Sequence, residues 1–239
     1  MDGQWDQDRL YVTVDLLILT VRSGQLCLLL FRREKPPYAG RWALPGRLIG
    51  PDESAETAAS LLLTEMLPVR CALMEQLYTF TDVNRDPRGR VISTAYLVIV
   101  PWDRLQAQLA AGETKVRCFQ AFMDAKGLRL QDGTGCRLIP GDLAFDHGRI
   151  IETGIQRLRG KIDYTDIGFH FLADPHAFTL GELQTVFEAV LGEPADSSNF
   201  RRTILNRYEK TGRLTQVVQA ERRGRGRPAA VYSFKLLSV

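Results

Sequence analysis

The sequence predicts an α+β protein whose two parts differ in the order of their secondary structure. Residues 10–32 contain two β-rich runs on either side of Ser23 and Gly24, a pattern typical of a β-hairpin. Apolar residues then recur at helical spacing over residues 55–66, so an amphipathic helix follows these strands. From residue 178 onward, two helical patterns come before two strand patterns. We therefore expect two domains of mixed α and β structure.

Length and composition agree with this division. The chain has 239 residues, of which 45% are hydrophobic and 25% charged, as is usual for globular proteins with a buried core. Its apolar runs are far shorter than the roughly 18 to 20 residues that a bilayer requires, and its polar start is unlike a secretory signal. We expect a cytoplasmic protein without membrane contact. The expected parts are residues 1–162, a junction at 163–175, and residues 176–239.

Charge is unevenly distributed between these parts. Residues 197–239 carry a net charge of +8, whereas residues 1–196 carry a net charge of −5. A mildly acidic body with a strongly basic end is the pattern expected when that end contacts a polyanion. A solvated tail is the alternative, but aromatic and periodic apolar residues in this region indicate that it folds. The cysteines are too widely spaced for a zinc site or a disulfide framework, so free thiols are expected at Cys27, Cys71, Cys118 and Cys136.

The first part is expected to alternate strands, loops and helices. After the hairpin, the Pro- and Gly-rich segment Lys35–Gly50 is expected to be a loop. Ser54 or Asp52 can cap the amphipathic helix, and Pro68 ends it. Its apolar face comprises Ala55, Ala58, Ala59, Leu62, Leu63 and Met66. Further along, the patterns predict a polar loop from Tyr78 to Val91, strands at Ile92–Val100 and Lys115–Phe122, and a helix at Asp142–Lys161.

The second part has the pattern of a winged helix-turn-helix. Thr179 and Glu182 have the spacing of a capping box, and Gly192 is a good stop for the helix that follows. A second helix is expected at about 198–209, capped by one of the residues from Asp196 to Ser198. Two strands with an Arg- and Gly-rich tip between them complete the expected motif.

One face of this second helix carries amide and guanidinium side chains, and the other face is apolar. Asn reads adenine and Arg reads guanine in a major groove, and arginines at the tip would neutralise phosphates. Arg201 falls among the apolar positions, so it is expected to reach a phosphate or to brace the wing. The alternative is a solvated face or a protein-interaction wing. The candidate DNA-binding residues are Ser198, Asn199, Arg201, Arg202, Asn206, Lys210, Arg223, Arg225 and Arg227.

The segment "GRWALPGRLIGPDESAETAASLLLTEMLPV" resembles a Nudix box, whose family pattern is G-x5-E-x7-R-E-U-x-E-E-x-G-U. Glu53, Leu63, Glu65 and Val69 match that pattern. The family's Arg, Glu, Glu and Gly are replaced by Leu61, Leu62, Met66 and Pro68, and the first Gly by Arg47. The family's carboxylates hold divalent metals against a pyrophosphate, and such hard cations need several oxygen ligands. We therefore expect no metal, no catalytic residues and no hydrolase activity.

Over essentially its whole length, the chain resembles the NrtR family, the Nudix-related transcriptional regulators of NAD metabolism. The stretches that carry this resemblance are "RWALPG", "RDPRGRVIS", "LAFDHGRIIETGIQRLRGK" and "FTLGELQTVFEAVLG…FRR…RGRPAAVYSF". The resemblance implies a Nudix-like α/β/α sandwich followed by a winged helix-turn-helix. It also implies a homodimeric repressor of NAD metabolism genes that needs no cofactor. Such a repressor binds a near-palindromic operator in double-stranded DNA and is released by ADP-ribose or a related NAD metabolite.

Arginines in the first part are candidates for the pyrophosphate of such an effector, because a guanidinium group matches phosphate oxygens bidentately. These candidates are Arg33, Arg41, Arg85, Arg88 and Arg90. Trp42 or Tyr78 could stack on an adenine, and Glu53, Asp82 or Asp146 could accept ribose hydroxyls. For each of them a purely structural role is the alternative, and His147 is expected to be structural. The helix at 142–161, which leads into the junction, is expected to transmit effector binding to the second part.

Two rival functions remain open from the sequence. The pocket of a protein with this architecture could have moved to another ligand, such as a sugar, after the metal site was lost. Alternatively, the chain could be a bifunctional pyrophosphatase and regulator, which the missing carboxylates argue against.

Overall fold

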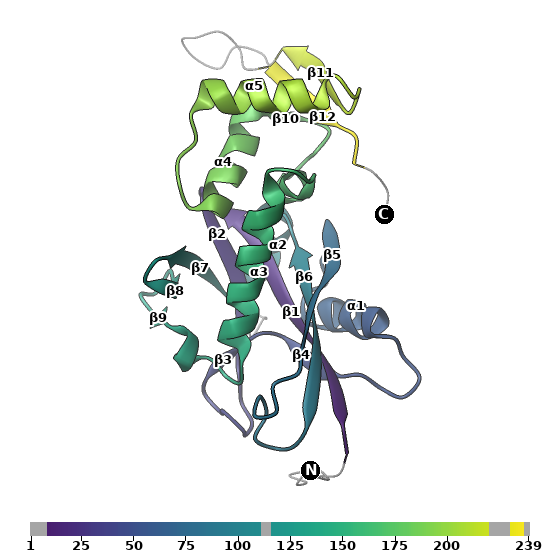
Figure 1. Ribbon diagram of the computed structural model, residues 1–239, viewed down its shortest axis with the longest axis vertical. Helices are drawn as coiled ribbons and strands as arrows, with labels where there is room; N and C mark the ends of the chain where they lie inside the picture. The colour runs from purple at the N-terminus through teal and green to yellow at the C-terminus, as the bar shows by residue number, and fades with distance from the viewer. Residues whose placement is uncertain (1–8, 111–115, 220–229, 237–239) are drawn as a thin grey trace.

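The computed structural model describes residues 9–110, 116–219 and 230–236 (Figure 1). A large sheet with helices on both faces forms one end of the elongated molecule, and a small sheet with two helices forms the other end. No helix within the described residues is long and apolar enough to cross a membrane. The four cysteines are free, as predicted.

The large sheet has nine strands within the described residues, with the main order β5-β6-β1-β2-β7-β8-β9. The neighbouring strands β1 and β6 run parallel, and β3 and β4 pair with β2 and β1. The strands are β1 (Tyr11–Arg22), β2 (Gln25–Arg32), β3 (Trp42–Ala43), β4 (Gly46–Leu48), β5 (Leu73–Phe80), β6 (Val91–Ile99), β7 (Val116–Asp124), β8 (Gly127–Asp132) and β9 (Arg137–Leu138). The predicted hairpin is confirmed, since β1 and β2 pair antiparallel around Ser23 and Gly24.

Alternating side chains of β1 divide the core of the sheet into two layers, because successive residues of a strand point to opposite faces. Leu16 and Ile18 pack into a cluster with α1 (Ala55–Met66) and α2 (Trp102–Ala110). Leu17 and Leu19 pack into a second cluster on the opposite face, with α3 (His147–Ile162). Gly154 lets α3 lie close to the sheet, because a Cβ there would sit 2.1 Å from Leu17 Cδ2. The result is the expected α/β/α sandwich.

Several boundaries differ from those that the sequence predicts. The segment Lys35–Gly50 is not only loop, because it contains β3 and β4, which are too short to show any periodicity. Residues 78–80 belong to β5, so the polar loop begins at residue 81. The helix expected from Asp142 begins at His147, after a short 3-10 turn at Pro140–Asp142. The predicted elements do not include α2, β5, β8 or β9, although β8 alternates buried and half-buried residues and the apolar residues of α2 recur at helical spacing.

The second part is a winged helix-turn-helix. It contains a 3-10 helix (Ile167–Phe171), β10 (Phe178–Thr179), α4 (Leu180–Leu191), α5 (Ser197–Tyr208), β11 (Leu214–Gln219) and β12 (Ala230–Phe234). The three strands pair in the order β10-β12-β11. The predicted capping box is confirmed, since Thr179 and Glu182 bond each other's backbone, and Gly192 ends α4 in the left-handed conformation.

An aromatic cluster holds this second part together. The rings of Phe169 and Phe234 stack with their centroids 3.6 Å apart, and Phe178 and Tyr208 meet Phe169 edge-on. Phe169 lies in the segment predicted as a junction, so part of that segment is packed with the winged helix. The division of the chain at 163–175 stays a prediction.

Candidate functional site: an arginine-lined pocket and a DNA-facing helix

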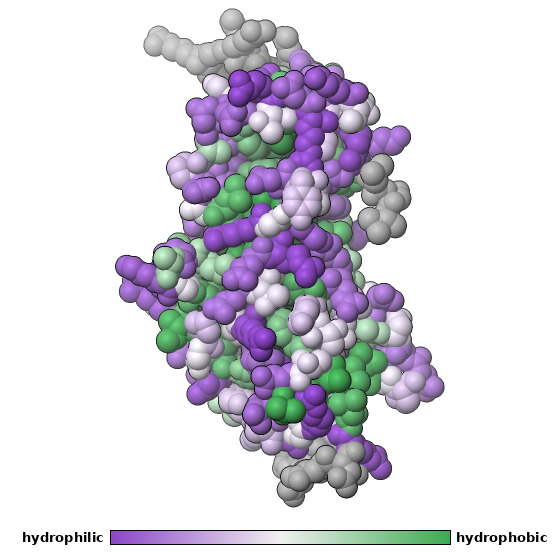
Figure 2. Space-filling model, in the orientation of Figure 1, coloured by the Kyte–Doolittle hydropathy of each residue, from purple (hydrophilic) through white to green (hydrophobic). Residues whose placement is uncertain are grey.

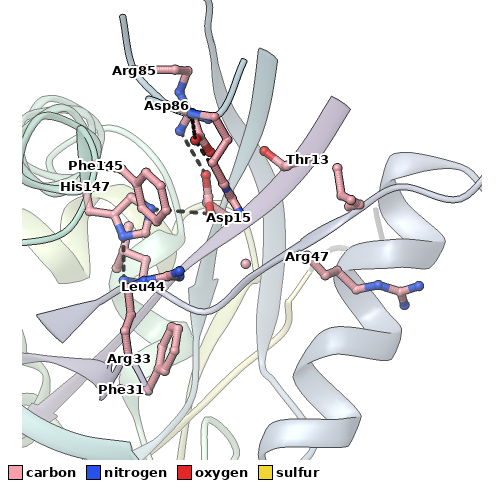
Figure 3. Close-up of a pocket in the computed structure, with 13 residues that line it drawn as sticks. Thr13, Asp15, Phe31, Arg33, Leu44, Arg47, Arg85, Asp86, Phe145 and His147 are labelled. Atoms are coloured by element: carbon pink, nitrogen blue, oxygen red, sulfur yellow. Dashed lines mark hydrogen bonds and ion pairs between the residues drawn. The ribbon is translucent and has the colours of Figure 1, made fainter. Parts of the chain in front are cut away.

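A pocket of about 180 Å³ opens where the strands β1, β2 and β4 meet the loop at 81–90 and the start of α3 (Figure 3). Four arginines and two aspartates line it, together with smaller and apolar groups. The lining comprises Thr13, Asp15, Phe31, Arg33, Leu44, Gly46, Arg47, Leu48, Arg85, Asp86, Arg88, Phe145 and His147. The arginine-rich loop therefore borders the pocket above the sheet, and most of the charged side chains in the lining are cationic.

A buried ion-pair network fixes the loop to the sheet and to α3. Arg85 is paired with Asp146 at 2.8 Å and with Asp15 at 3.2 Å. Burial acts to lower the pKa of Arg85, but the bonds to Asp146 and Asp15 outweigh it and raise that pKa. The Ser93 hydroxyl donates to the same Asp15 oxygen that Arg85 bonds, with its Oγ 2.5 Å from Oδ2. Arg85 is thus committed to structural partners at the back of the pocket.

His147 completes the wall of the pocket and plays a structural part. The Leu44 backbone N–H donates to its Nδ1 over 2.8 Å, and its Nε2 lies 3.6 Å from Asp15 Oδ1. Burial lowers the pKa of His147, so the ring is neutral near pH 7 and carries its proton on Nε2. These contacts agree with the structural role expected from the sequence.

Two arginines at the mouth of the pocket share one aromatic ring. The guanidinium carbons of Arg33 and Arg88 lie 4.7 and 5.5 Å from the ring centroid of Phe145. Burial and the charge of Arg88 both lower the pKa of Arg33. Arg88 therefore repels the charge of Arg33, so an anion that contacts both guanidinium groups would be stabilised. Asp86 offsets part of this charge through its 2.7 Å ion pair with Arg88.

The other predicted effector residues lie outside this lining or beside it. Arg41 donates to the carbonyls of Gly141 and Leu143, and Arg90 donates to those of Thr81 and Asp82. Trp42 packs edge-on against Phe119, and Glu53 bonds Arg47 and the Gly50 backbone ahead of α1. A separate, neighbouring hollow collects Tyr78, Asp82 and Asp146 with Arg149.

Asp15, Asp86 and Phe145 line the pocket but are not among the residues predicted from the sequence. Asp15 is 5% exposed in an otherwise apolar strand, and a lone carboxylate in such a run is a signal of a buried charge partner. Phe145 adopts a left-handed backbone conformation (φ 54°), which turns the chain just before α3. No local pattern in the sequence indicates that conformation.

The residues at the Nudix box do not fit a divalent metal. Leu62 and Leu63 are buried against the sheet, and the carboxylate of Glu53 is occupied by Arg47 and a backbone N–H. Glu65 is exposed, and the next residue, Met66, is half-buried. Across the described parts of the chain, no three His, Cys, Asp or Glu side chains gather where they could hold a metal ion.

The helix α5 presents a polar face at the far end of the molecule, where the surface is hydrophilic (Figure 2). Phe200, Ile204 and Tyr208 are buried, whereas Ser198, Asn199, Arg202, Asn206 and the following Lys210 are exposed. Arg202 donates to Asn199 Oδ1 over 2.9 Å. Arg201 braces the wing, because it donates to the Tyr232 hydroxyl of β12 over 3.0 Å. The wing-tip candidates Arg223, Arg225 and Arg227 lie outside the described residues.

Comparison with known proteins agrees with both halves of this architecture. A family model for the NUDIX domain matches residues 10–134, and one for the NrtR DNA-binding winged helix domain matches residues 168–234. The molecule is therefore a Nudix domain joined to a DNA-binding winged helix. The chain belongs to the NrtR family.

Three relatives illustrate the similarity. The ADPR responsive transcriptional repressor NtrR of Acinetobacter baylyi is 30% identical over 227 residues, covering 94% of this chain and 82% of that protein. The solved structure of Shewanella oneidensis NrtR in complex with a 27mer DNA has a TM-score of 0.74 and 32% identity, covering 94% of this chain and 93% of that one. The ADP-ribose pyrophosphatase of Methanocaldococcus jannaschii is 30% identical over 144 residues, covering 60% of this chain and 75% of that protein.

Proposed function

We propose that this protein is a transcriptional repressor of NAD metabolism genes and that ADP-ribose or a related NAD metabolite releases it from DNA. The observation that carries the proposal is that Arg33 and Arg88 both approach the ring of Phe145, in a domain whose described residues contain no cluster of metal ligands. A diphosphate between two guanidinium groups would gain charge-assisted hydrogen bonds without a metal. The Acinetobacter baylyi relative, described as ADPR responsive, supports the same effector.

We assign the diphosphate to Arg33 and Arg88, and one end of the ligand to the neighbouring hollow at Tyr78, Asp82 and Asp146. Tyr78 is 55% exposed beside Asp82 and Asp146, so it is available to stack on a base while those carboxylates accept hydroxyl protons. Arg85 acts on the ligand only through its position, since its guanidinium group is held by Asp15 and Asp146. Arg41, Trp42, Glu53 and Arg90 take no direct part in this assignment.

DNA binding is assigned to α5 and the wing. The exposed Asn199, Arg202 and Asn206 lie on the face of α5 opposite its buried aromatic residues, as a recognition helix requires. The relative from Shewanella oneidensis was solved with a 27mer DNA, which supports the assignment. Two copies related by a two-fold axis would read a near-palindromic operator, so we propose a homodimer as the binding species.

The Nudix domain is proposed to have lost its hydrolase activity. The box helix packs Leu62 against the core at a position where the family has a metal-binding Glu. The similarity to an ADP-ribose pyrophosphatase makes hydrolysis the competing function, and it predicts release of AMP from ADP-ribose in the presence of Mg²⁺ or Mn²⁺.

A gel shift tests this proposal directly. The DNA is the region upstream of the protein's own gene, and the additions are ADP-ribose, NAD, nicotinamide mononucleotide and simple sugars. We expect a specific complex that only ADP-ribose or a close relative dissolves, and a steep fall in affinity with salt. Release by a sugar alone would favour the rival ligand, and failure to bind DNA at any salt concentration would overturn the assignment to a repressor.

A further inference from the structure

The helix α3 joins the pocket to the winged helix. It runs along the long axis of the molecule, and its 16 residues span about 24 Å at 1.5 Å per residue (Figure 1). At its start, Asp146 is bonded to Arg85, and His147 is bonded to the Leu44 backbone in the pocket wall. A displacement of the loop at 81–90 or of Leu44 therefore acts on the first turn of α3.

At the other end of α3, Arg159 contacts both domains at once. Its Nε donates to the Val190 carbonyl of α4 over 2.9 Å, and its Nη1 donates to the Met123 carbonyl of β7 over 2.8 Å. The two accepting carbonyls come from the winged helix and from the sheet of the Nudix domain. One planar guanidinium group thus spans the boundary between the domains.

The sequence at the end of α4 leaves a place for this arginine. In a continuing helix, the Val190 carbonyl would accept from the N–H of residue 194, but that residue is Pro194 and has no N–H. Arg159 supplies the missing donor, and its charge suits the negative end of the helix dipole. Gly192 makes room for it, because a Cβ there would lie 2.8 Å from Arg159 Nη2.

We propose that Arg159 is the positioning residue that couples effector binding to DNA release, by fixing the orientation of α4 on the Nudix sheet. This inference rests on the proposed function. An effector can shift the DNA-binding equilibrium only if the two arrangements of the domains differ in their affinity for it. Since α3 begins at the pocket and Arg159 lies in its last turn, a shift of α3 changes the alignment of Val190 with Met123.

The test measures operator binding by fluorescence anisotropy, with and without ADP-ribose, for the wild type and for Arg159→Ala, Arg159→Lys and Arg157→Ala. Arg157→Ala is the matched control, because it removes the same charge from the same helix. Within the described residues, the Arg157 side chain makes no hydrogen bond or ion pair. Calorimetry gives the affinity of each protein for ADP-ribose in the absence of DNA, and circular dichroism checks the fold.

We expect the affinity of every variant for ADP-ribose to be within about twofold of the wild-type affinity. In Arg159→Ala, the ratio of the operator Kd with ADP-ribose to the Kd without it should fall at least about fivefold, which is at the lower end of usual allosteric couplings. The ratio for Arg159→Lys should lie between those of the wild type and Arg159→Ala, since an ammonium group lacks the planar fork of a guanidinium group. A wild-type ratio in folded Arg159→Ala would overturn the inference. If Arg159→Ala fails to fold, Arg159→Lys decides in the same way.

A second measurement separates this inference from the proposed function. If the wild-type protein binds DNA and ADP-ribose does not change that binding, the proposed effector is wrong. Small-angle X-ray scattering of the free proteins then tests the role of Arg159 separately. Its loss should change the scattering curve from that of Arg157→Ala, because the domains are no longer held in one orientation. Identical curves would overturn the positioning role.

Discussion

Arg85 donates hydrogen bonds to both carboxylate oxygens of Asp146, over 2.8 and 3.1 Å, although 61 residues separate them in the chain. The same guanidinium group reaches Asp15 in the centre of β1. The most buried arginine of the pocket therefore holds the fold. Arg33 and Arg88 are half-buried, and their bonds, to the Pro37 carbonyl and to Asp86, stay within their own loops, so a ligand would meet their guanidinium groups in addition to these partners.

Replacing Arg85 should lower the stability of the protein more than it weakens ligand binding. Arg85→Ala leaves Asp15 buried without its cationic partner, and removal of one member of a buried pair costs about 3–5 kcal/mol. Urea unfolding followed by circular dichroism would measure this loss. Arg90→Ala is the control in the same loop, because Arg90 bonds only exposed backbone carbonyls in the contacts recorded for it. Equal losses in the two variants would refute the structural role of Arg85.

Replacing Arg33 or Arg88 should affect ligand binding more than stability. Arg33→Ala and Arg88→Ala should each weaken ADP-ribose binding roughly tenfold or more, the value of a lost charge-assisted hydrogen bond. Arg32→Ala removes the same charge from the next residue, which is exposed and donates to the Gly40 carbonyl outside the pocket. Isothermal titration calorimetry would compare the three. An equal effect of Arg32→Ala would show that only overall charge matters.

Local patterns predicted those elements whose stability is local. The helix α1 repeats its apolar residues at helical spacing and is capped by Ser54, and the hairpin turn at Ser23 and Gly24 is recognisable by residue type. The strands β3 and β4 could not be predicted in this way. They have two and three residues, and they exist because β1 and β2 offer them backbone partners.

In the candidate site, too, local features were predictable from the sequence and long-range contacts were not. The arginines of the loop at 81–90 stood out in the sequence by their density, but their roles depend on partners far along the chain. Arg85 meets Asp15 across 70 residues and Asp146 across 61, whereas Arg90 turns back to its own loop. Sequence alone therefore identified the loop and could not separate the buried arginine from those that face the pocket.

The Nudix box should resist restoration by single substitutions. Leu62 is 6% exposed among apolar side chains, so Leu62→Glu would bury a carboxyl group without a partner and cost several kcal/mol, roughly 2–7 kcal/mol for an uncompensated polar group. Leu61 is 45% exposed, and Leu61→Arg should change stability by only about 0.5 kcal/mol. Thermal or urea unfolding measures both. A stable Leu62→Glu protein that cleaves ADP-ribose with Mg²⁺ would contradict this expectation.

Tyr208 makes the stability of the winged helix depend on alkaline pH. Burial raises the pKa of Tyr208 to about 12, and its hydroxyl donates to the Thr165 carbonyl over 3.2 Å. The unfolded chain releases this proton near its ordinary pKa of about 10, before the folded protein does. The contribution is therefore complete below pH 10 and is lost as the pH rises from about 10 to about 12.

Tyr208→Phe tests this dependence, because phenylalanine keeps the ring contact with Phe169 and cannot ionise. The free energy of unfolding of the wild type should fall more steeply than that of Tyr208→Phe between pH 10 and 12. The two curves should run parallel between pH 7 and 9. Parallel curves over the whole range would mean that Tyr208 has no raised pKa.

The recognition helix and the wing should differ in what they contribute to DNA binding. Asn206 and Arg202 are exposed on α5, so Asn206→Ala or Arg202→Ala should reduce operator affinity by about 1–3 kcal/mol if the side chain reads a base, and relax specificity at one position. Arg201 instead bonds the Tyr232 hydroxyl, so Tyr232→Phe, which leaves every charge in place, should mimic part of the effect of Arg201→Ala.

Salt dependence distinguishes these roles. Loss of a phosphate contact lowers the slope of log K against log salt by about one, whereas loss of a brace lowers affinity without changing that slope. We therefore expect Tyr232→Phe to weaken operator binding without changing the slope from that of the wild type. Fluorescence anisotropy at salt concentrations from about 50 to about 200 mM would measure it. If Arg201→Ala reduces the slope by about one while Tyr232→Phe binds like the wild type, Arg201 contacts a phosphate when DNA is bound and its bond to Tyr232 is incidental.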